Sequence, residues 1–375
     1  MIGASTGVRR PSFRAERAMM KTVDRRHVLK LSAGAAAAGL ISPFAAATDA
    51  FAQASQLVVS DFGGDWATWN KANIDAKFTE ITKVPVLHDT GSDNAARIAK
   101  AKLGIPRSEY DLICLADSFF ARAQSEGILE AINYKSPKLT NLKDVDPRFI
   151  TPNYTSFLFN GLGMGYNPKM VKSPPTSWAD MWNKDYRGKI VLPAVVHSFG
   201  LHVILLSALA AGKDYKDTQA GLDNLKRLAD LDPIWTVDSQ ANARSLFQEE
   251  AAIGWLGRAE WVQVQNWGGA TKFVLPSEGG FFTSWGFGPI QNTKNMALIE
   301  DYVNVTLDPQ LQAANAKKLG FHPTNTKWKD YIDAESAAKI SWTPEEQKRF
   351  VAIDYAWLNS KRAELTEAWN RTVGR

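Results

Sequence analysis

Cysteine is nearly absent from this sequence, with Cys114 the only one in 375 residues. A single cysteine excludes an internal disulfide. It stands in the apolar run at residues 111–115, and a cysteine in such a run is usually buried and unreactive. The thiol is therefore expected to pack in the interior, where it would not act as a nucleophile.

The sequence also lacks a long, strongly apolar run. The nearest candidate, residues 31–47, is rich in alanine and is interrupted by Pro43. A membrane-spanning helix needs roughly 20 predominantly apolar residues, so neither a membrane anchor nor an ordinary amphipathic helix is the preferred interpretation of this run.

The flanks of that run indicate export instead. Arg25 and Arg26 precede it, and small residues at Ala52 and Ala54 follow it. This order resembles a twin-arginine signal at residues 1–54, with cleavage after Ala54. No cysteine follows the cleavage point, which excludes a lipid anchor on a new N-terminal cysteine. A soluble periplasmic protein is expected.

Net charge is absent once this signal is removed. Of the 44 bases and 39 acids in the chain, 8 bases and 3 acids lie in residues 1–54, which leaves 36 of each. The remaining chain therefore has no electrostatic footprint for nucleic acid, and no nucleic-acid partner is predicted.

Motifs of enzymes and metal sites are missing as well. There is no Gly-x-Ser-x-Gly elbow, no paired-histidine zinc motif and no phosphate-binding Gly-x-x-x-x-Gly-Lys loop. The glycines of residues 161–165 have the wrong spacing for a dinucleotide site. His197 and His202 are five residues apart and do not share a helix face as a metal pair would. We expect no catalysis, cofactor or metal, with a periplasmic enzyme as a remote alternative.

Alternating strands and helices are present along residues 56–115. Strands are predicted at residues 56–60, 84–87 and 110–115, with helices at 65–82 and 95–103. This alternation favours a parallel sheet covered by helices, and such sheets bind ligands at the carboxyl ends of their strands. A site is therefore expected around residues 62–66 and 116–119.

A second α/β unit follows Gly161. Its strands are predicted at 189–193, 251–256 and 272–275, and its helices at 176–182, from Ser198 or Gly200 to Ala211, at 222–231 and at 239–249. A glycine-rich segment spans residues 279–288, and helices are predicted from Lys294 onward. The length of residues 55–375 favours two lobes over one core.

Several short motifs resemble those of family 1 extracellular solute-binding proteins. They occur in the order found in the spermidine/putrescine-binding proteins, at residues 110–113 (YDLI), 126–129 (EGIL), 176–182 (TSWADMW), 186–189 (YRGK), 276–280 (PSEGG) and 320–325 (GFHPTN). The resemblance implies a two-lobed periplasmic binding protein fold of type II, an α/β fold with a ligand cleft between lobes. It also implies a monomer that delivers a small solute to the permease subunits of an ABC importer.

The resemblance further implies two chain crossings between the lobes, near Gly161 and near Gly286. Residues 55–161 and 286–324 are expected to form the first lobe, and residues 162–285 and 325–375 the second. The glycines of residues 161–165 and 286–288 are expected to act as hinges during closure of the cleft.

Acidic residues are missing where polyamine-binding relatives have them. Residues 194–198 and 281–285 contain no Asp or Glu, and burying a polycation without carboxylates is strongly unfavourable. A small organic anion or zwitterion is therefore predicted, such as a carboxylate, an amino acid or an aminocarboxylate. A polyamine- or thiamine-type cation remains the alternative, held mainly by aromatic rings.

The predicted ligand-binding residues lie at strand ends and in the glycine-rich segment. They are Phe62, Gly63, Gly64, Trp66, Asp117, Ser118, Phe119, His197, Ser198, Arg258, Ser284 and Trp285.

The roles expected of these residues differ. Arg258 is expected to hold a carboxylate through two parallel hydrogen bonds, unless it pairs with Glu260 or Glu249. Asp117 pairs with a ligand amine or caps the helix that follows it. Ser198 is expected to contribute the positive end of its helix, and the aromatic rings to provide flat apolar walls. Trp285 is either one of these walls or part of the core.

Overall fold

The computed structural model describes residues 56–91 and 94–374. The predicted export signal and its cleavage point lie outside the described residues. No helix within these two ranges is long and apolar enough to cross a membrane.

The first α/β unit forms the parallel sheet that the sequence predicts. Strand β1 (Leu57–Asp61) pairs in parallel with β2 (Val86–Thr90) and with β3 (Leu112–Ala116). The chain between β1 and β2 forms α1 (Gly64–Asn70), a π-helical turn at 71–75 and α2 (Ala76–Thr82). Helices α3 (Asn94–Gly104) and α4 (Asp117–Ser125) flank β3 in sequence. The turn after β1 needs Gly64, whose φ of 66° is unfavourable for other residues.

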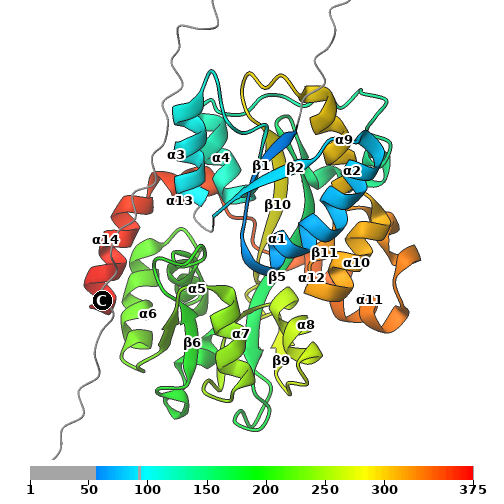
Figure 1. Cartoon of the computed structure of the whole chain (residues 1–375). Coiled ribbons are helices and arrows are strands. Elements are labelled where there is room, and N and C mark those ends of the chain that lie inside the picture. Colours follow the sequence, from blue (N-terminus) through cyan, green and yellow to red (C-terminus); the bar gives the residue numbers. More distant parts are fainter. Residues whose placement is uncertain (1–55, 92–93, 375) are drawn as a thin grey trace, which may run out of the picture. The chain divides into compact units, whose positions relative to one another are not determined.

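Strand β5 (Tyr154–Tyr166) joins this unit to the second one. Its first part pairs antiparallel with β10 (Phe281–Pro289), which also pairs with β3, and its last part pairs with β8 (Ile253–Gly257). The main sheet order is β2-β1-β3-β10-β5-β8-β6-β7, and β4 (Ile150–Thr151), β9 (Lys272–Val274) and β11 (His322–Pro323) also pair with β5. Both halves of the sheet thus share one long strand (Figure 1).

The second α/β unit contains β6 (Ile190–Pro193) and β7 (Ile234–Thr236), with β6 parallel to both β7 and β8. Its helices are α5 (His202–Ala210), α6 (Thr218–Ala229), α7 (Ser239–Phe247) and α8 (Arg258–Asn266). Short 3₁₀ turns occupy 178–182 and 184–186, and Ser177 caps the first of them, as predicted.

The prediction that α5 begins at Ser198 or Gly200 is wrong, because the helix begins at His202. Residues 195–201 form consecutive turns, in which Gly200 N–H donates to the carbonyl of His197. The His197 ring adds a local constraint, since its Nδ1 accepts a hydrogen bond from Phe199 N–H at 2.9 Å. Ser198 therefore precedes the helix and does not start it.

The chain after Lys294 is mainly helical, as predicted, apart from β11. It contains α9 (Met296–Thr306), α10 (Pro309–Leu319), α11 (Ala334–Ile340), α12 (Pro344–Lys348), α13 (Tyr355–Ser360) and α14 (Arg362–Val373). Further 3₁₀ turns lie at 142–144, 147–149 and 326–331. Helix α13 packs against α4 of the first unit, and α14 packs against α6 of the second. The end of the chain therefore contacts both units (Figure 1).

The two largest clusters of buried apolar side chains belong to different halves of the sheet. One contains Phe78, Phe157 and Tyr302, and the other contains Trp178 and Trp255. Cys114 is fully buried in the first cluster, and burial raises the pKa of its thiol well above the usual value. The interior position predicted for this thiol is confirmed.

Candidate ligand-binding site

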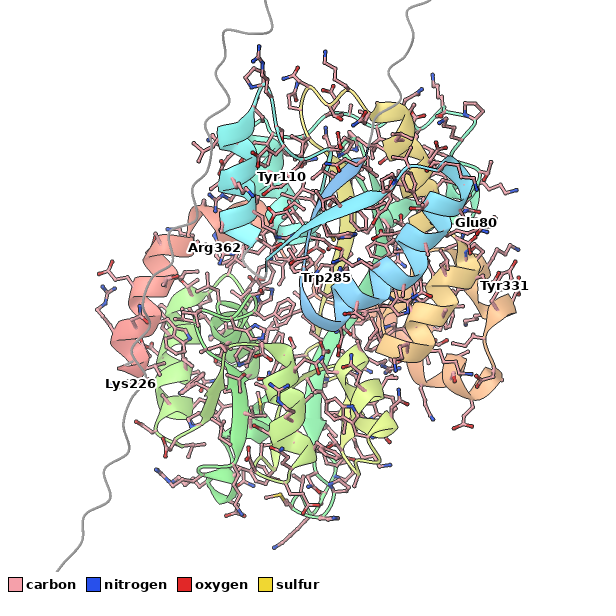
Figure 2. The ribbon with its side chains drawn as sticks, in the orientation of Figure 1. Glu80, Tyr110, Lys226, Trp285, Tyr331 and Arg362 are labelled. Atoms are coloured by element: carbon pink, nitrogen blue, oxygen red, sulfur yellow. The ribbon has the colours of Figure 1, made fainter. Side chains whose placement is uncertain are left out.

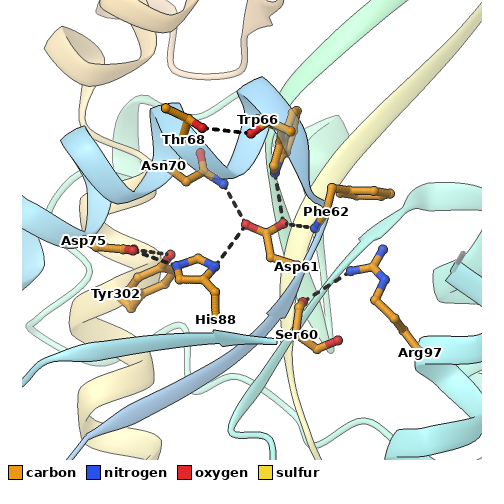
Figure 3. Close-up of polar contacts among 11 residues, drawn as sticks. Ser60, Asp61, Phe62, Trp66, Thr68, Asn70, Asp75, His88, Arg97 and Tyr302 are labelled. Atoms are coloured by element: carbon orange, nitrogen blue, oxygen red, sulfur yellow. Dashed lines mark hydrogen bonds and ion pairs between the residues drawn. The ribbon is translucent and has the colours of Figure 1, made fainter. Parts of the chain in front are cut away.

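The turn after β1 is fixed by a buried carboxylate at the end of that strand. Asp61 is fully buried and accepts hydrogen bonds from Phe62 N–H at 2.7 Å, from the Trp66 indole N–H at 2.9 Å and from the Asn70 amide at 2.9 Å (Figure 3). Gly63 and Gly64 are exposed. Asp61 thus sets the positions of two predicted ligand-binding residues, Phe62 and Trp66, although it was not itself among them.

A histidine neutralises this carboxylate from the neighbouring strand. The ring of His88 lies between Asp61, at 3.5 Å from Nδ1, and Asp75, at 2.6 Å from Nε2, and Tyr302 donates to Asp75 at 3.0 Å (Figure 3). Burial alone lowers the pKa of a histidine, but the two carboxylates outweigh it and raise the pKa of His88 to about 9. His88 is therefore a cation at neutral pH.

Four aromatic rings surround Trp66 beside this turn. The centroids of Phe62, Phe157, Phe321 and Trp285 lie 5.5–6.0 Å from that of Trp66. Most of these contacts are edge-to-face, a favourable arrangement for aromatic pairs. The structure therefore brings together three of the predicted walls, from the turn after β1, from α1 and from β10.

The sequence left open whether Trp285 is a wall of the ligand site or part of the core. Its ring is half-buried and packs against both of the large apolar clusters, the only side chain among the described residues to do so. Figure 2 shows it on β10, near the level where strands β1–β3 give way to helices α5–α8. It is thus part of the packing and also retains an exposed surface.

Asp117 connects the end of β3 to β10. One carboxylate oxygen accepts from Ser118 N–H at 2.8 Å and from the Thr283 hydroxyl at 3.1 Å, and the other accepts from Ser284 N–H at 3.0 Å. Burial raises the pKa of Asp117 to about 6, against the opposing effect of these hydrogen bonds. Both Asp117 and Ser284, two predicted site residues, are engaged in this joint.

Asp117 and Ser284 also line a cavity of about 500 Å³, the Asp117 cavity. Its other polar groups include Arg148, which forms an ion pair with Asp146. They also include Tyr154 and Ser156, and the Ser156 hydroxyl lies 2.9 Å from that of Ser284. Its aromatic walls are Phe149, Phe159, Phe282 and Phe350. A half-buried carboxylate and a guanidinium beside apolar walls suit a small organic solute that carries a charged group and an apolar body.

The loop after β6 presents one exposed and one buried residue of the predicted set. Ser198 is exposed, whereas His197 is buried and supports the turn through Phe199. Burial lowers the pKa of His197 to about 4, so its ring is neutral at pH 7. Because α5 begins at His202, Ser198 does not lie at the positive end of that helix.

Arg258, at the start of α8, forms an ion pair with Glu346 of α12. Its two terminal nitrogens donate to the Glu346 carboxylate and to the carbonyl of Ser341, each at 2.7 Å, and its guanidinium lies 3.7 Å from the centroid of Trp342. Neither Glu260 nor Glu249 is its partner. The side chain lines a different cavity, of about 340 Å³, together with Glu346. Sequence analysis missed Glu346 because it lies 88 residues away.

Two further predicted residues lie beside the C-terminal helices. The Ser118 carbonyl accepts from Asn359 of α13 at 2.9 Å, and the Phe119 ring faces Arg362 of α14 at 5.7 Å. Phe119 therefore stands apart from the rings around Trp66.

Comparison with known proteins identifies the family. The family model of bacterial extracellular solute-binding proteins matches residues 108–349, so the chain belongs to that family. The spermidine/putrescine-binding periplasmic protein of Escherichia coli K12 is 23% identical over 296 residues, which cover 76% of this chain and 82% of that protein. The resemblance predicted from the sequence motifs is confirmed.

Two solved structures share the fold. A structure titled as the Atu4243 GABA receptor has a TM-score of 0.73 and 21% identity, covering 85% of this chain and 97% of its own. The spermidine/putrescine ABC transporter substrate-binding protein PotD from Streptococcus pneumoniae has a TM-score of 0.68 and 20% identity, covering 85% and 99%. The fold is the two-lobed one of periplasmic binding proteins, as predicted, and the protein binds a solute.

Proposed function

We propose that this solute-binding protein works in the periplasm as a monomer, captures a small aminocarboxylate between its two lobes and delivers it to the permease of an ABC importer. The observation that carries the proposal is the position of Trp285. Its half-buried ring joins both apolar clusters and lies against Trp66, which β1 and Asp61 hold in place. A solute that contacts this ring lies beside the point where the two apolar clusters meet.

Closure of the lobes is the proposed mechanism. The first lobe comprises residues 55–161 and 286–324, and the second comprises residues 162–285 and 325–375. Support comes from β5, which pairs with β10 from Thr155 to Leu162 and with β8 from Leu162 to Tyr166. A small rotation about such shared strands is a hinge motion, and contacts made only in the closed state shift the population towards it. The importer then recognises the closed form.

Export by the twin-arginine pathway is part of the same proposal. It rests on Arg25 and Arg26, the short alanine-rich run and the small residues before position 55. Replacing both arginines with lysines should keep a tagged precursor in the cytoplasm, whereas the unchanged protein should reach the periplasmic fraction. Normal export of the double variant would refute this route.

The chemistry of the ligand is inferred from the missing acids and from the names of similar proteins. One relative is named for spermidine and putrescine, which are amines, and one neighbour for GABA, which carries both an amine and a carboxylate. The Asp117 cavity contains one carboxylate, enough for a single ammonium, and one guanidinium, that of Arg148, whereas a polyamine carries several ammonium groups. A single ammonium with a carboxylate therefore fits better than a polycation.

A polyamine is the second candidate, because the Asp117 cavity combines a carboxylate with four phenylalanine rings. In that case binding should strengthen between pH 5 and pH 7, since the pKa of Asp117 is about 6 and only the ionised form attracts a cation. Aminocarboxylates that form most of their contacts with other groups should show a weaker dependence on pH.

The test is thermal unfolding of residues 55–375 with a panel of amino acids, 4-aminobutyrate, aromatic acids, putrescine, spermidine and thiamine. A ligand at 100 times its dissociation constant adds about 2.7 kcal/mol of stability, which raises the melting temperature by several degrees. Small-angle scattering with the positive ligand should then show a more compact protein. Identical scattering with and without that ligand would refute lobe closure.

A further inference from the structure

We propose that Arg362 binds the anionic group of the solute, an inference that rests on the binding function proposed above. Arg362 is the first residue of α14, directly after α13. Since α13 packs against α4 and α14 packs against α6, Arg362 lies where the chain passes from one half of the molecule to the other (Figure 2). An anion held there is in reach of both halves.

Arg362 has no carboxylate partner among the described residues. Its side chain is half-buried, and within residues 56–91 and 94–374 no carboxylate lies at ion-pair distance from it. Its recorded contacts are a hydrogen bond from Nη2 to the Asn359 amide oxygen at 3.2 Å and the Phe119 ring at 5.7 Å. Arg258 is also half-buried but has Glu346 beside it. A partly desolvated guanidinium without a carboxylate partner favours the binding of an anion more than a guanidinium that is already paired.

The groups around Arg362 add no negative charge. His202 of α5 is buried, its two ring nitrogens have no hydrogen-bond partner in the described part of the chain, and burial lowers its pKa to about 3. Burial likewise raises the pKa of Tyr355 on α13 well above its usual value, so this phenol is neutral. Arg122 of α4 is already paired with Glu126. No described side chain named here compensates the positive charge of Arg362, and we infer that a ligand anion does so.

A carboxylate is the anion that best fits this site. The planar guanidinium presents parallel N–H groups that match two carboxylate oxygens. Asp117, on the same helix as Phe119, offers the opposite charge, and Tyr355 lies near enough to Asp117 and Arg362 for both charges to affect its pKa. We therefore infer an aminocarboxylate whose carboxylate meets Arg362 and whose ammonium is attracted by Asp117.

The experiment compares Arg362→Gln and Arg362→Lys with the unchanged protein. The probes are 4-aminobutyrate and putrescine, which have similar length and differ in the carboxylate, together with acetate and benzoate at high concentration. Calorimetry should show a loss of at least about tenfold in affinity for the carboxylate probes in Arg362→Gln, with partial recovery in Arg362→Lys and no change for putrescine. Arg371→Gln is the control, because Arg371 lies on the same helix, is exposed and pairs with Glu367.

A second measurement needs no ligand. Because Gln removes an uncompensated charge, unliganded Arg362→Gln should unfold at the same temperature as the unchanged protein or at a higher one. Unchanged carboxylate binding in Arg362→Gln would overturn the inference. Binding of putrescine but of no carboxylate would overturn the anion site while leaving the solute-binding function intact. Binding of no probe, with a less stable Arg362→Gln, would count against both.

Discussion

The charged histidine between two buried carboxylates predicts a specific dependence of stability on pH. The perturbation is His88→Gln, which keeps a polar side chain of similar reach but removes the titratable ring. The carboxylates of Asp61 and Asp75 and the hydroxyl of Tyr302 are the groups that face this ring. In the unchanged protein the three charges alternate in sign, and in the variant the two carboxylates face each other without a cation.

The magnitude follows from the pKa of His88, which rises from 6.5 in the unfolded chain to about 9 in the folded protein. One pKa unit corresponds to about 1.4 kcal/mol, so the ion pairs contribute about 3 kcal/mol to the free energy of unfolding. A raised histidine pKa means that the folded protein binds the proton more tightly than the unfolded chain. This contribution is therefore complete below about pH 6.5 and is lost as the pH rises through about 9.

The assay is urea denaturation of both proteins at intervals from pH 6 to pH 10. The difference in unfolding free energy between them should be about 3 kcal/mol at pH 6 and should shrink towards pH 10, because only the unchanged protein carries the ring. His322→Gln is the matched control, since burial lowers the pKa of His322 to about 4 and its ring stays neutral over this range. A constant difference between the unchanged protein and His88→Gln across the range would refute the reasoning.

Three further predictions concern single positions. In Gly161→Ala the new methyl group would lie 2.1 Å from the Trp342 ring, so urea denaturation should show a loss of about 2 kcal/mol or more, whereas Gly104→Ala, with 3.6 Å of space, should show little change. Arg258→Ala removes the ion pair with Glu346 and should cost about 3 kcal/mol of stability; if calorimetry also shows a large loss of ligand affinity, Arg258 belongs to the ligand site as well. Burial raises the pKa of Asp117 from 3.8 to about 6, so ionisation of Asp117 destabilises the folded protein. As the pH falls from 7 to 4, the unfolding free energy of the unchanged protein should therefore rise by about 2–3 kcal/mol relative to that of Asp117→Asn. Unfolding free energies that change in parallel with pH in the two proteins would contradict this.

Local patterns were sufficient to predict most of the fold. Short segments were enough to predict single elements: a β-branched run predicts β1, the glycines after it predict its end, and an apolar run predicts β3. Both strands lie close to the predicted residues. The start of α5 was missed for a physical reason. The apolar run at 199–206 suits a helix, but turns stabilised by the His197 ring delay it, and no periodic pattern records such a side-chain contact.

The candidate site, like the fold, could be predicted only in part. Phe62 and Trp66 follow the end of β1 and were predicted from the rule that ligands meet parallel sheets at the carboxyl ends of strands. The contacts between distant parts of the chain were not predictable. Asp117 and Ser284 are 167 residues apart, and Asp75 and Tyr302 are 227 apart, so neither pair forms a local pattern. The role proposed for Arg362 could not be predicted from the sequence, because it depends on which of the described side chains lie beside the guanidinium in three dimensions.

The passage of the last helices across both halves has a practical consequence. A fluorescent group on the exposed side of α14, near Glu367 or Arg371, would lie on a segment that packs against the second unit through α6. A second group on the exposed end of α3, near Leu103, would report from the first unit. With the closure of the lobes proposed above, energy transfer between the two groups would convert solute capture into an optical signal, and the protein would then serve as a reagentless sensor for its own ligand.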